Sequence, residues 1–195
     1  MRKIALTGPS GAGKGYVSAI LEKKGYPVLD TDALVHELYR GNDLPQRIAG
    51  LFGEQTLFPD GSVDRSVLRQ IVFSDPEALR RLNRLVHAVV KNEVALWLEQ
   101  KRAEGHALAF VDAPQLFEAD MQGDFDLTVA VTASDEVRLQ RICLRDGIDE
   151  ETARARMKNQ MTAKMYSERC DYTVQNDVNT DPEERIDTLI NMILK

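Results

Sequence analysis

The chain has 195 residues, of which 43% are hydrophobic and 29% are charged, and its formal net charge is −6. This length allows one compact domain with a substantial buried core, and the negative net charge argues against a general nucleic-acid binder and against a membrane-surface binder. Because no apolar run approaches the ~20 residues of a membrane span and the first residues form a core strand, not a signal peptide, we expect a soluble cytoplasmic protein.

A short strand, a glycine-rich loop and a helix open the chain. Residues 4–6 are apolar and predict a buried parallel strand, and Gly8–Lys14 follow with the spacing G-x-x-x-x-G-K. Such a loop turns backbone N–H groups toward a phosphate, Lys14 adds a positive charge, and the next helix directs its positive end at the same anion. A glycine-rich turn without a ligand is the alternative, but the flanking strand and helix favour phosphate binding. The residue after Lys14, usually a Ser or Thr that binds magnesium, is Gly15.

Strand and helix patterns alternate along the rest of the chain, which predicts an α/β fold with a parallel sheet. Between Asp32 and Gln100 the pattern is mainly helical, so we expect a helical subdomain over the carboxyl edge of the sheet, where ligands bind in such folds. Capping boxes with a proline in the first turn mark two helix starts, at Ser74–Glu77 and Thr180–Glu183. The expected strands are Ile4–Thr7, Pro27–Asp30, Ala107–Asp112, Leu127–Thr132 and Asp171–Val174.

Two aspartates follow expected strands and could carry chemistry. Asp32 comes after the second strand, where a carboxylate can accept a proton from a hydroxyl or hold magnesium. Its alternative role is the N-cap of a helix over residues 33–39, and the position beside the phosphate loop favours chemistry. Asp112 closes the third strand as the Walker B acid does, which would reach the magnesium shell, and a turn or cap before Pro114 is an equal alternative.

Basic residues form one local cluster and one isolated position. Arg138, Arg141 and Arg145 are spaced three and four residues apart, so they lie on one helical face and could bind phosphate. For Arg138 we expect the alternative, a solvated position with Glu partners. His87 is a single histidine on a long amphipathic helix, and the residues alone favour a core or surface role without a ligand.

Several separated motifs occur in a fixed order along almost the whole chain. In the list that follows, the letters in brackets give the pattern of the family named after it. The motifs are Thr7–Gly15 (T-G-G-I-G-S-G-K-S), Asp30–Asp32 (D-A-D), Phe52-Gly53, Asp60-Gly61, Arg65, Leu68, Phe73, His87-Ala88 (H-P), Pro114–Glu118 (P-L-L-F-E), Arg141 with Arg145, Arg156 with Gln160, and Asp171–Asn176 (D-Y-x-I-x-N). With this set the sequence resembles the dephospho-CoA kinases, which phosphorylate the ribose 3′-hydroxyl of dephospho-CoA. Three departures limit what the resemblance implies: Gly15, Ala88 and Gln115.

The resemblance implies an architecture and a reaction. The fold would be the three-layer α/β fold of P-loop NTPases, with a core at residues 1–31 and 105–195, a helical CoA subdomain at about 32–104 and a lid at about 146–166. The reaction would transfer the γ-phosphoryl group of ATP, with Mg²⁺, to dephospho-CoA, the last step of coenzyme A biosynthesis. We expect no nucleic-acid or membrane partner, and a monomer or weak homo-oligomer. The alternatives are another P-loop nucleoside or nucleotide kinase and a nucleotide-binding regulatory protein with little catalysis.

The same resemblance and the residue patterns together give the expected site. Catalysis would rest on Asp32, which orients and deprotonates the 3′-hydroxyl, on Lys14, which holds the phosphates with the loop amides, and on Arg145, which neutralises the transferring charge. His87, from the resemblance, becomes a contact for dephospho-CoA. Nucleotide binding is expected of Gly11, Ala12, Gly13, Lys14, Gly15, Tyr16, Arg141 and Asn176; substrate binding of Asp32, Arg65, His87 and Phe117; and metal binding, directly or through water, of Asp112.

Overall fold

A computed structural model describes residues 1–41 and 43–194 of the chain. The chain divides into two compact units, one made of Met1–Leu29 with Gln100–Lys195 and the other of Asp30–Glu99. The first unit contains the glycine-rich loop Gly8–Lys14. The second unit is one continuous stretch of the chain, and it is mainly helical.

The first unit is built on a five-stranded sheet with the strand order β2-β3-β1-β4-β5. Neighbouring strands β1 and β3, β1 and β4, and β4 and β5 run parallel. The predicted parallel α/β sheet is therefore confirmed, with strand ends shifted by one or two residues. The strands are β1 (Arg2–Thr7), β2 (Val28–Asp30), β3 (Leu108–Asp112), β4 (Leu127–Thr132) and β5 (Tyr172–Gln175).

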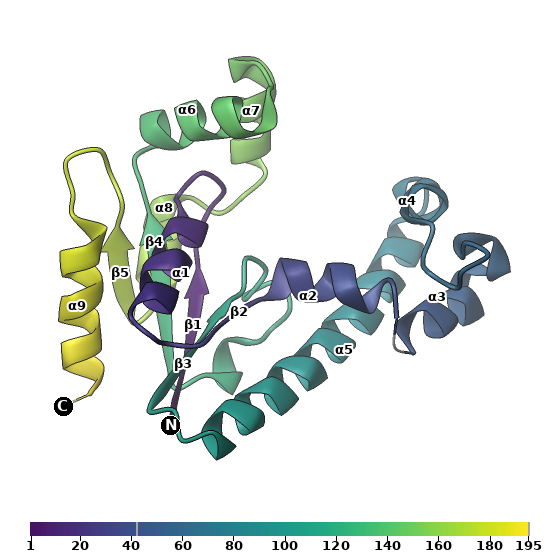
Figure 1. Ribbon diagram of the computed structural model, residues 1–195. Coiled ribbons are helices and arrows are strands. Elements are labelled where there is room, and N and C mark those ends of the chain that lie inside the picture. Colours follow the sequence, from purple (N-terminus) through teal and green to yellow (C-terminus); the bar gives the residue numbers. More distant parts are fainter. Residues whose placement is uncertain (42, 195) are drawn as a thin grey trace. The chain divides into compact units, whose positions relative to one another are not determined.

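Helices α1 (Lys14–Lys23) and α9 (Pro182–Ile193) pack together against this sheet (Figure 1). The central strands are mainly apolar, and their residues are buried without alternation over most of each strand, as in strands covered on both faces. The core that the two helices share with the sheet includes Val17, Ile20, Leu21, Ile186, Leu189, Ile190 and Ile193 from the helices and Ile4, Leu6, Phe110, Val129 and Val131 from the strands. Burial of this core fixes α1, and therefore the loop that precedes α1, against the end of β1.

Three further helices follow β4: α6 (Asp135–Asp146), α7 (Glu150–Lys158) and α8 (Ala163–Arg169). Helices α6 and α7 form a small core of their own around Leu139, Ile142 and Ala153. Gly147 ends α6 in the left-handed conformation, with φ 64°, and its N–H donates to the carbonyl of Cys143. The chain therefore reverses between α6 and α7 within the residues predicted to form a lid.

The described residues of the second unit form, in chain order, α2 (Thr31–Leu38), α3 (Leu44–Phe52), α4 (Arg65–Phe73) and most of α5 (Pro76–Ala103). A 3₁₀ turn at Glu54–Thr56 joins α3 to the next loop. Between Asp32 and Gln100 the described residues contain no strand, only an isolated bridge between Leu57 and Val63. The predicted helical character of this segment is confirmed.

Both predicted capping boxes name the wrong capping residue, because the residue that caps each helix lies one position later in the sequence. Asp181, not Thr180, caps α9, because its carboxylate accepts the N–H groups of Glu183 at 2.9 Å and Glu184 at 3.3 Å. The Thr180 hydroxyl instead donates to the carbonyl of Asp177. At the start of α5 the Asp75 carboxylate accepts the N–H of Glu77 in the same way. A proline at the first helical position holds the preceding residue in extended backbone, which is the conformation of an N-cap.

Within the described parts of the chain, none of the helices has both the length and the apolar composition needed to span a membrane.

Candidate functional site

The loop from Gly8 to Lys14 joins β1 to α1 and depends on glycine at two close approaches. Gly8 has φ 143°, and a Cβ there would lie 2.1 Å from the carbonyl oxygen of Val131. Gly13 has φ 89°, and a Cβ there would lie 2.1 Å from Nδ2 of Asn176. Lys14 Nζ donates to the carbonyl oxygen of Gly8 at 3.0 Å, so the lysine side chain lies back over the loop. This is the wrapped form that a phosphate-binding loop needs.

Two side chains from distant parts of the sequence hold the carbonyl groups of the loop. Asn176, buried after β5, donates from Nδ2 to the carbonyl oxygen of Ala12 at 2.9 Å. Arg141 Nη1, on α6, donates to the same carbonyl at 3.3 Å and to that of Gly11 at 3.4 Å. Lys14 and Gly15 form the start of α1, and the N-terminal end of a helix attracts negative charge. With its carbonyls held and these residues at a helix start, the loop is suited to an anion.

Arg138 corrects the expectation that it is solvated. Its side chain is 2% exposed, Nε donates to the carbonyl of Ser10 at 3.0 Å, and Nη1 pairs with Asp135 at 2.8 Å. A Cβ on Gly11 would lie 2.7 Å from the carbonyl oxygen of Arg138, so α6 and the loop are in close contact. Spacing alone places Arg138 and Ile142 on one helix side, but only the fold shows that this side is buried.

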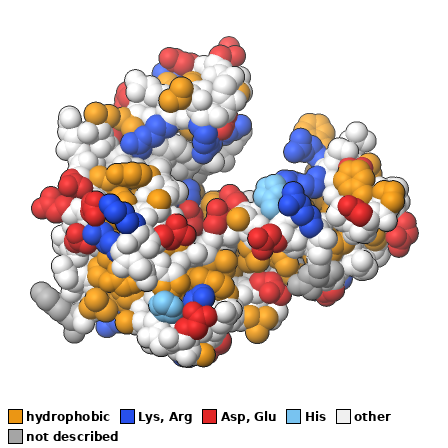
Figure 2. All heavy atoms as spheres, viewed as in Figure 1, with side chains coloured by type: hydrophobic (Ala, Val, Ile, Leu, Met, Phe, Trp, Pro, Cys, Tyr) orange, Lys and Arg blue, Asp and Glu red, His pale blue; other side chains and the backbone are white. Residues whose placement is uncertain are grey.

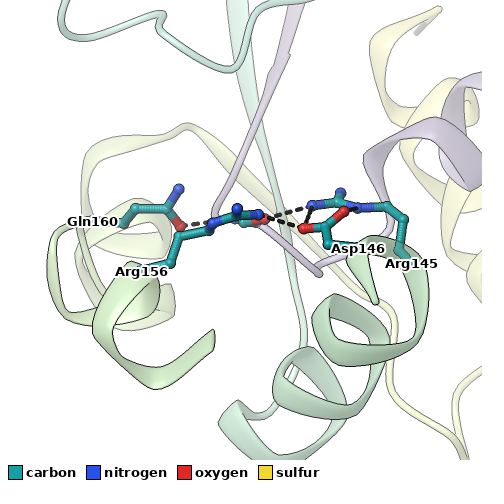
Figure 3. A network of polar contacts seen from close by, with 5 residues as sticks. Arg145, Asp146, Arg156 and Gln160 are labelled. Atoms are coloured by element: carbon teal, nitrogen blue, oxygen red, sulfur yellow. Dashed lines mark hydrogen bonds and ion pairs between the residues drawn. The ribbon is translucent and has the colours of Figure 1, made fainter. Parts of the chain in front are cut away.

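Arg145, at the end of α6, belongs to a charged network near the loop (Figure 3). Its Nε and Nη2 donate to the two carboxylate oxygens of Asp146 at 2.7 and 3.0 Å, and Arg156 pairs with the same carboxylate. The Arg145 hydrogen bonds, with a smaller contribution from Arg156, lower the pKa of Asp146 to about 2. Because the pKa falls on folding, the pairs contribute stability above the ordinary aspartate pKa of 3.8 and lose it as pH falls through about 2.

Lys and Arg side chains gather on the surface formed by α6 and α7 (Figure 2). Arg145 is 58% exposed in its side chain, so its guanidinium can exchange partners when an anion binds. Tyr16, on the first turn of α1, is 59% exposed as well. The first unit thus places Arg145 and Tyr16 beside the loop, and their roles at a nucleotide site stay predictions.

The possible metal ligands lie where β3 ends. Asp112 is buried, and its Oδ2 accepts the hydroxyl of Ser18, on α1, at 3.4 Å. A Cβ added to Gly15 would meet no atom within 4 Å. The hydroxyl of Thr7, at the start of the loop, is buried and has no hydrogen-bond partner among residues 1–41 and 43–194. Carboxylate and hydroxyl oxygens are the donors that magnesium prefers, so these residues fit a magnesium ion held mainly by ATP and water.

No cluster of three or more His, Cys, Asp or Glu side chains suited to a metal is present in the described residues.

Phe117 lies in a cluster that the sequence did not reveal. The guanidinium of Arg169, on α8, lies 3.9 Å from the centre of the Phe117 ring, and the Tyr166 ring lies 6.1 Å from it. Burial, with the charge of Glu118, raises the pKa of Tyr166 to about 12. Phe117 therefore presents a ring stacked with a cation, and no pattern in the sequence predicts that contact.

In the second unit, Asp32 does not cap α2. The cap is Asp30, whose Oδ1 accepts the N–H groups of Asp32 at 2.8 Å and Ala33 at 3.1 Å. Asp32 itself is exposed in the first helical turn. The alternative role considered for Asp32 is therefore wrong, and its role as a base stays a prediction.

Arg65 and His87 lie on different helices of the second unit. Arg65 opens α4, where Nη1 lies 3.0 Å from Nδ1 of His36 and the guanidinium lies 5.7 Å from the Tyr39 ring centre. His36 carries no sequence motif, so this cluster was not foreseen. His87 is half-buried on α5. The substrate-binding roles of Arg65, His87 and Phe117 stay predictions.

A family model described as "Dephospho-CoA kinase" matches residues 2–182. The chain belongs to the dephospho-CoA kinase family. A dephospho-CoA kinase from Anaeromyxobacter dehalogenans is 37% identical over 177 residues, which are 90% of this chain and 84% of that protein. A dephospho-CoA kinase from Arabidopsis thaliana is 35% identical over 182 residues, covering 93% of this chain and 78% of its own length. The predicted family membership and kinase class are thus confirmed.

A solved structure from Thermus thermophilus has a TM-score of 0.83 and 33% identity, and the match covers 100% of this chain and 98% of that one. A shikimate kinase from Acinetobacter baumannii has a TM-score of 0.54 at 19% identity, covering 100% of this chain and 93% of that one, which bears on fold alone. The dephospho-CoA kinase family member described here therefore has the three-layer α/β fold of P-loop kinases, as predicted.

Proposed function

We propose that this dephospho-CoA kinase family member transfers the γ-phosphoryl group of ATP to the ribose 3′-hydroxyl of dephospho-CoA, giving coenzyme A and ADP. The observation that carries the proposal is the phosphate loop, whose carbonyls are held by Arg141 and Asn176 in a chain that matches this family from residue 2 to 182. A loop of this kind binds the triphosphate of a nucleotide.

The residues divide the work of the transfer. Lys14 and the first amides of α1 hold the β- and γ-phosphates, and Arg145 neutralises charge on the transferring group. Asp32 accepts the proton of the 3′-hydroxyl, the bond from that oxygen to the γ-phosphorus forms, and the bond from phosphorus to the bridging oxygen of ADP breaks. Arg65, His87 and Phe117 are proposed to bind dephospho-CoA, and Tyr16 the nucleotide.

Magnesium is proposed as the metal, because the side chains at the end of β3 fit it. Asp112 and Ser18 would hold it, directly or through water. When bound, magnesium neutralises charge on the β- and γ-phosphate oxygens. Lys14 and Arg145 add positive side-chain charge near the same phosphates.

An acceptor screen tests the proposed function. ADP release is measured with ATP and, in parallel, dephospho-CoA, nucleoside monophosphates, adenosine and pantetheine derivatives. We expect release with dephospho-CoA and formation of coenzyme A. Release with a nucleoside monophosphate alone would assign the chain to another P-loop kinase activity. ATP binding without release for any acceptor would favour a regulatory nucleotide-binding protein.

Two coarser properties are also proposed. The enzyme would act in the cytoplasm, which fits its free cysteines, Cys143 and Cys170, because reducing compartments keep thiols unpaired. It would be a monomer or a weak homo-oligomer, which sedimentation at several protein concentrations measures directly.

Gly15→Ser should lower the magnesium concentration needed for half-maximal turnover by about fivefold, equivalent to ~1 kcal/mol. A serine hydroxyl can replace one water on the metal, and the site has room for the side chain because a Cβ there meets nothing within 4 Å. Magnesium titrations of turnover and of ATP binding measure the effect. Gly15→Ala is the matched control, since it adds the Cβ without the oxygen. Equal curves for the serine variant, the alanine variant and the parent would show that the missing hydroxyl has no energetic consequence.

A further inference from the structure

Ser10, in the middle of the phosphate loop, is bound through its amide, carbonyl and hydroxyl by residues between positions 138 and 160. Its N–H donates to Oε1 of Gln160 at 3.0 Å, and its carbonyl oxygen accepts Nε of Arg138 at 3.0 Å. Its hydroxyl accepts Nη2 of Arg145 at 3.2 Å. The loop is thereby joined to α6 and to the residues after α7.

Only one of these three bonds depends on the serine side chain. The bonds to Gln160 and Arg138 use backbone atoms, so any non-proline residue at position 10 could make them. The bond from Arg145 needs the hydroxyl oxygen as an acceptor. The contact between residue 10 and Arg145 therefore requires a side chain with an acceptor atom, which Ser10 supplies.

The other partner of Arg145 does not fix it relative to the loop. Asp146 is the next residue on the same helix end, so its two bonds to Arg145 orient the guanidinium within the α6–α7 segment. Arg156, on α7, and Gln160, just after α7, lie on the side of the network opposite Arg145 in Figure 3. Among the described residues, the Ser10 hydroxyl is the loop side chain that binds the Arg145 guanidinium.

We propose that Ser10 is a positioning residue that places Arg145 at the phosphate loop for phosphoryl transfer. This inference rests on the proposed function, in which Arg145 neutralises transferring charge. Arginine is long and loses much rotamer freedom when it is fixed, so a bond that orders it before the reaction reduces the entropy lost in the transition state. The effect should appear in kcat and hardly in ATP affinity, because the loop amides and Lys14 bind the ground state.

Ser10→Ala tests the proposal. We expect kcat to fall about tenfold, with the Kd for ATP changed less than about twofold. Ser10→Thr keeps a hydroxyl acceptor and should restore most of the lost kcat. Thermal unfolding of each variant shows whether the fold is intact.

A double-mutant cycle separates positioning of Arg145 from a general role in the loop. In an Arg145→Ala background, Ser10→Ala should cause no further loss, because its partner is already absent. An equal tenfold loss in both backgrounds would overturn the proposal and assign Ser10 to loop structure. Unchanged kcat in the single variant would overturn it too, and a raised kcat would show that Ser10 restrains Arg145 away from the reaction.

A second measurement does not depend on the acceptor. Aluminium fluoride bound with ADP mimics the transferring phosphoryl group, so its gain in affinity over ADP alone reports the Arg145 contact. Ser10→Ala should reduce this gain about tenfold in the parent and leave it unchanged in Arg145→Ala. If the parent shows no turnover with dephospho-CoA, the proposed function fails while this cycle still decides the role of Ser10. An unchanged gain in Ser10→Ala would reject the inference alone.

Discussion

Asp32→Asn is expected to lower kcat by about 10²-fold or more while leaving the Kd for ATP nearly unchanged, since a general base contributes ~10²–10⁴ to the rate. Asparagine keeps the size of the side chain and removes the proton acceptor. Asp32 is exposed in the first turn of α2 and is not the helix cap, so the loss would report chemistry and not helix formation. Single-turnover rates and nucleotide binding give the two quantities.

Asp30→Ala is the matched control for this variant. It removes the carboxylate that accepts the N–H groups of Asp32 and Ala33, and the loss of such a cap costs about 0.5–2 kcal/mol of stability. We expect a lower melting temperature with kcat reduced far less than in Asp32→Asn. If Asp32→Asn turned over at the parental rate, Asp32 would not be the base.

Lys14→Ala should weaken ATP binding and also lower kcat, each by about 10²-fold. The ammonium group lies over the loop, 3.0 Å from the carbonyl of Gly8, and its charge acts on the phosphates both before and during transfer. Nucleotide titration and steady-state kinetics measure the two effects. This pattern differs from that of Asp32→Asn, which leaves binding intact.

Lys23→Ala is the charge-matched control, because Lys23 is exposed in the last turn of the same helix. It changes the net charge by the same amount and should alter neither quantity by more than about twofold, since exposed charges far from a site are screened. If Lys14→Ala and Lys23→Ala behaved alike, the loop would not be the triphosphate site.

The sequence predicted those features that depend on local pattern. Strands such as Leu127–Thr132 are mainly apolar, which predicts that their residues are buried. Val17, Ile20 and Leu21 have helical spacing, which predicts that they lie on the buried side of one helix. The loop from Gly8 to Lys14 could be predicted because its glycines and lysine are close in sequence. The aspartates before Pro76 and Pro182 were missed as caps, although a proline at the first helical position is a usable signal for them.

Features that depend on tertiary contact could not be predicted. Arg138, Arg141 and Arg145 are spaced regularly along one helix. Arg138 is nevertheless buried against Ser10, whereas Arg145 is exposed beside Asp146. The choice depends on how α6 packs, which no local pattern contains. The same holds for the stacking of Arg169 on Phe117 and for the contact of His36 with Arg65, because each pairs segments that are distant in sequence.

The hydrogen bond from Asn176 to Ala12 joins residues 164 positions apart. A chain that ended before β5 would carry the complete glycine-rich motif and Arg141, but it would lack Asn176, the other side chain that holds the loop. This support of the loop can therefore form only late in biosynthesis, once the last strand of the sheet has been made.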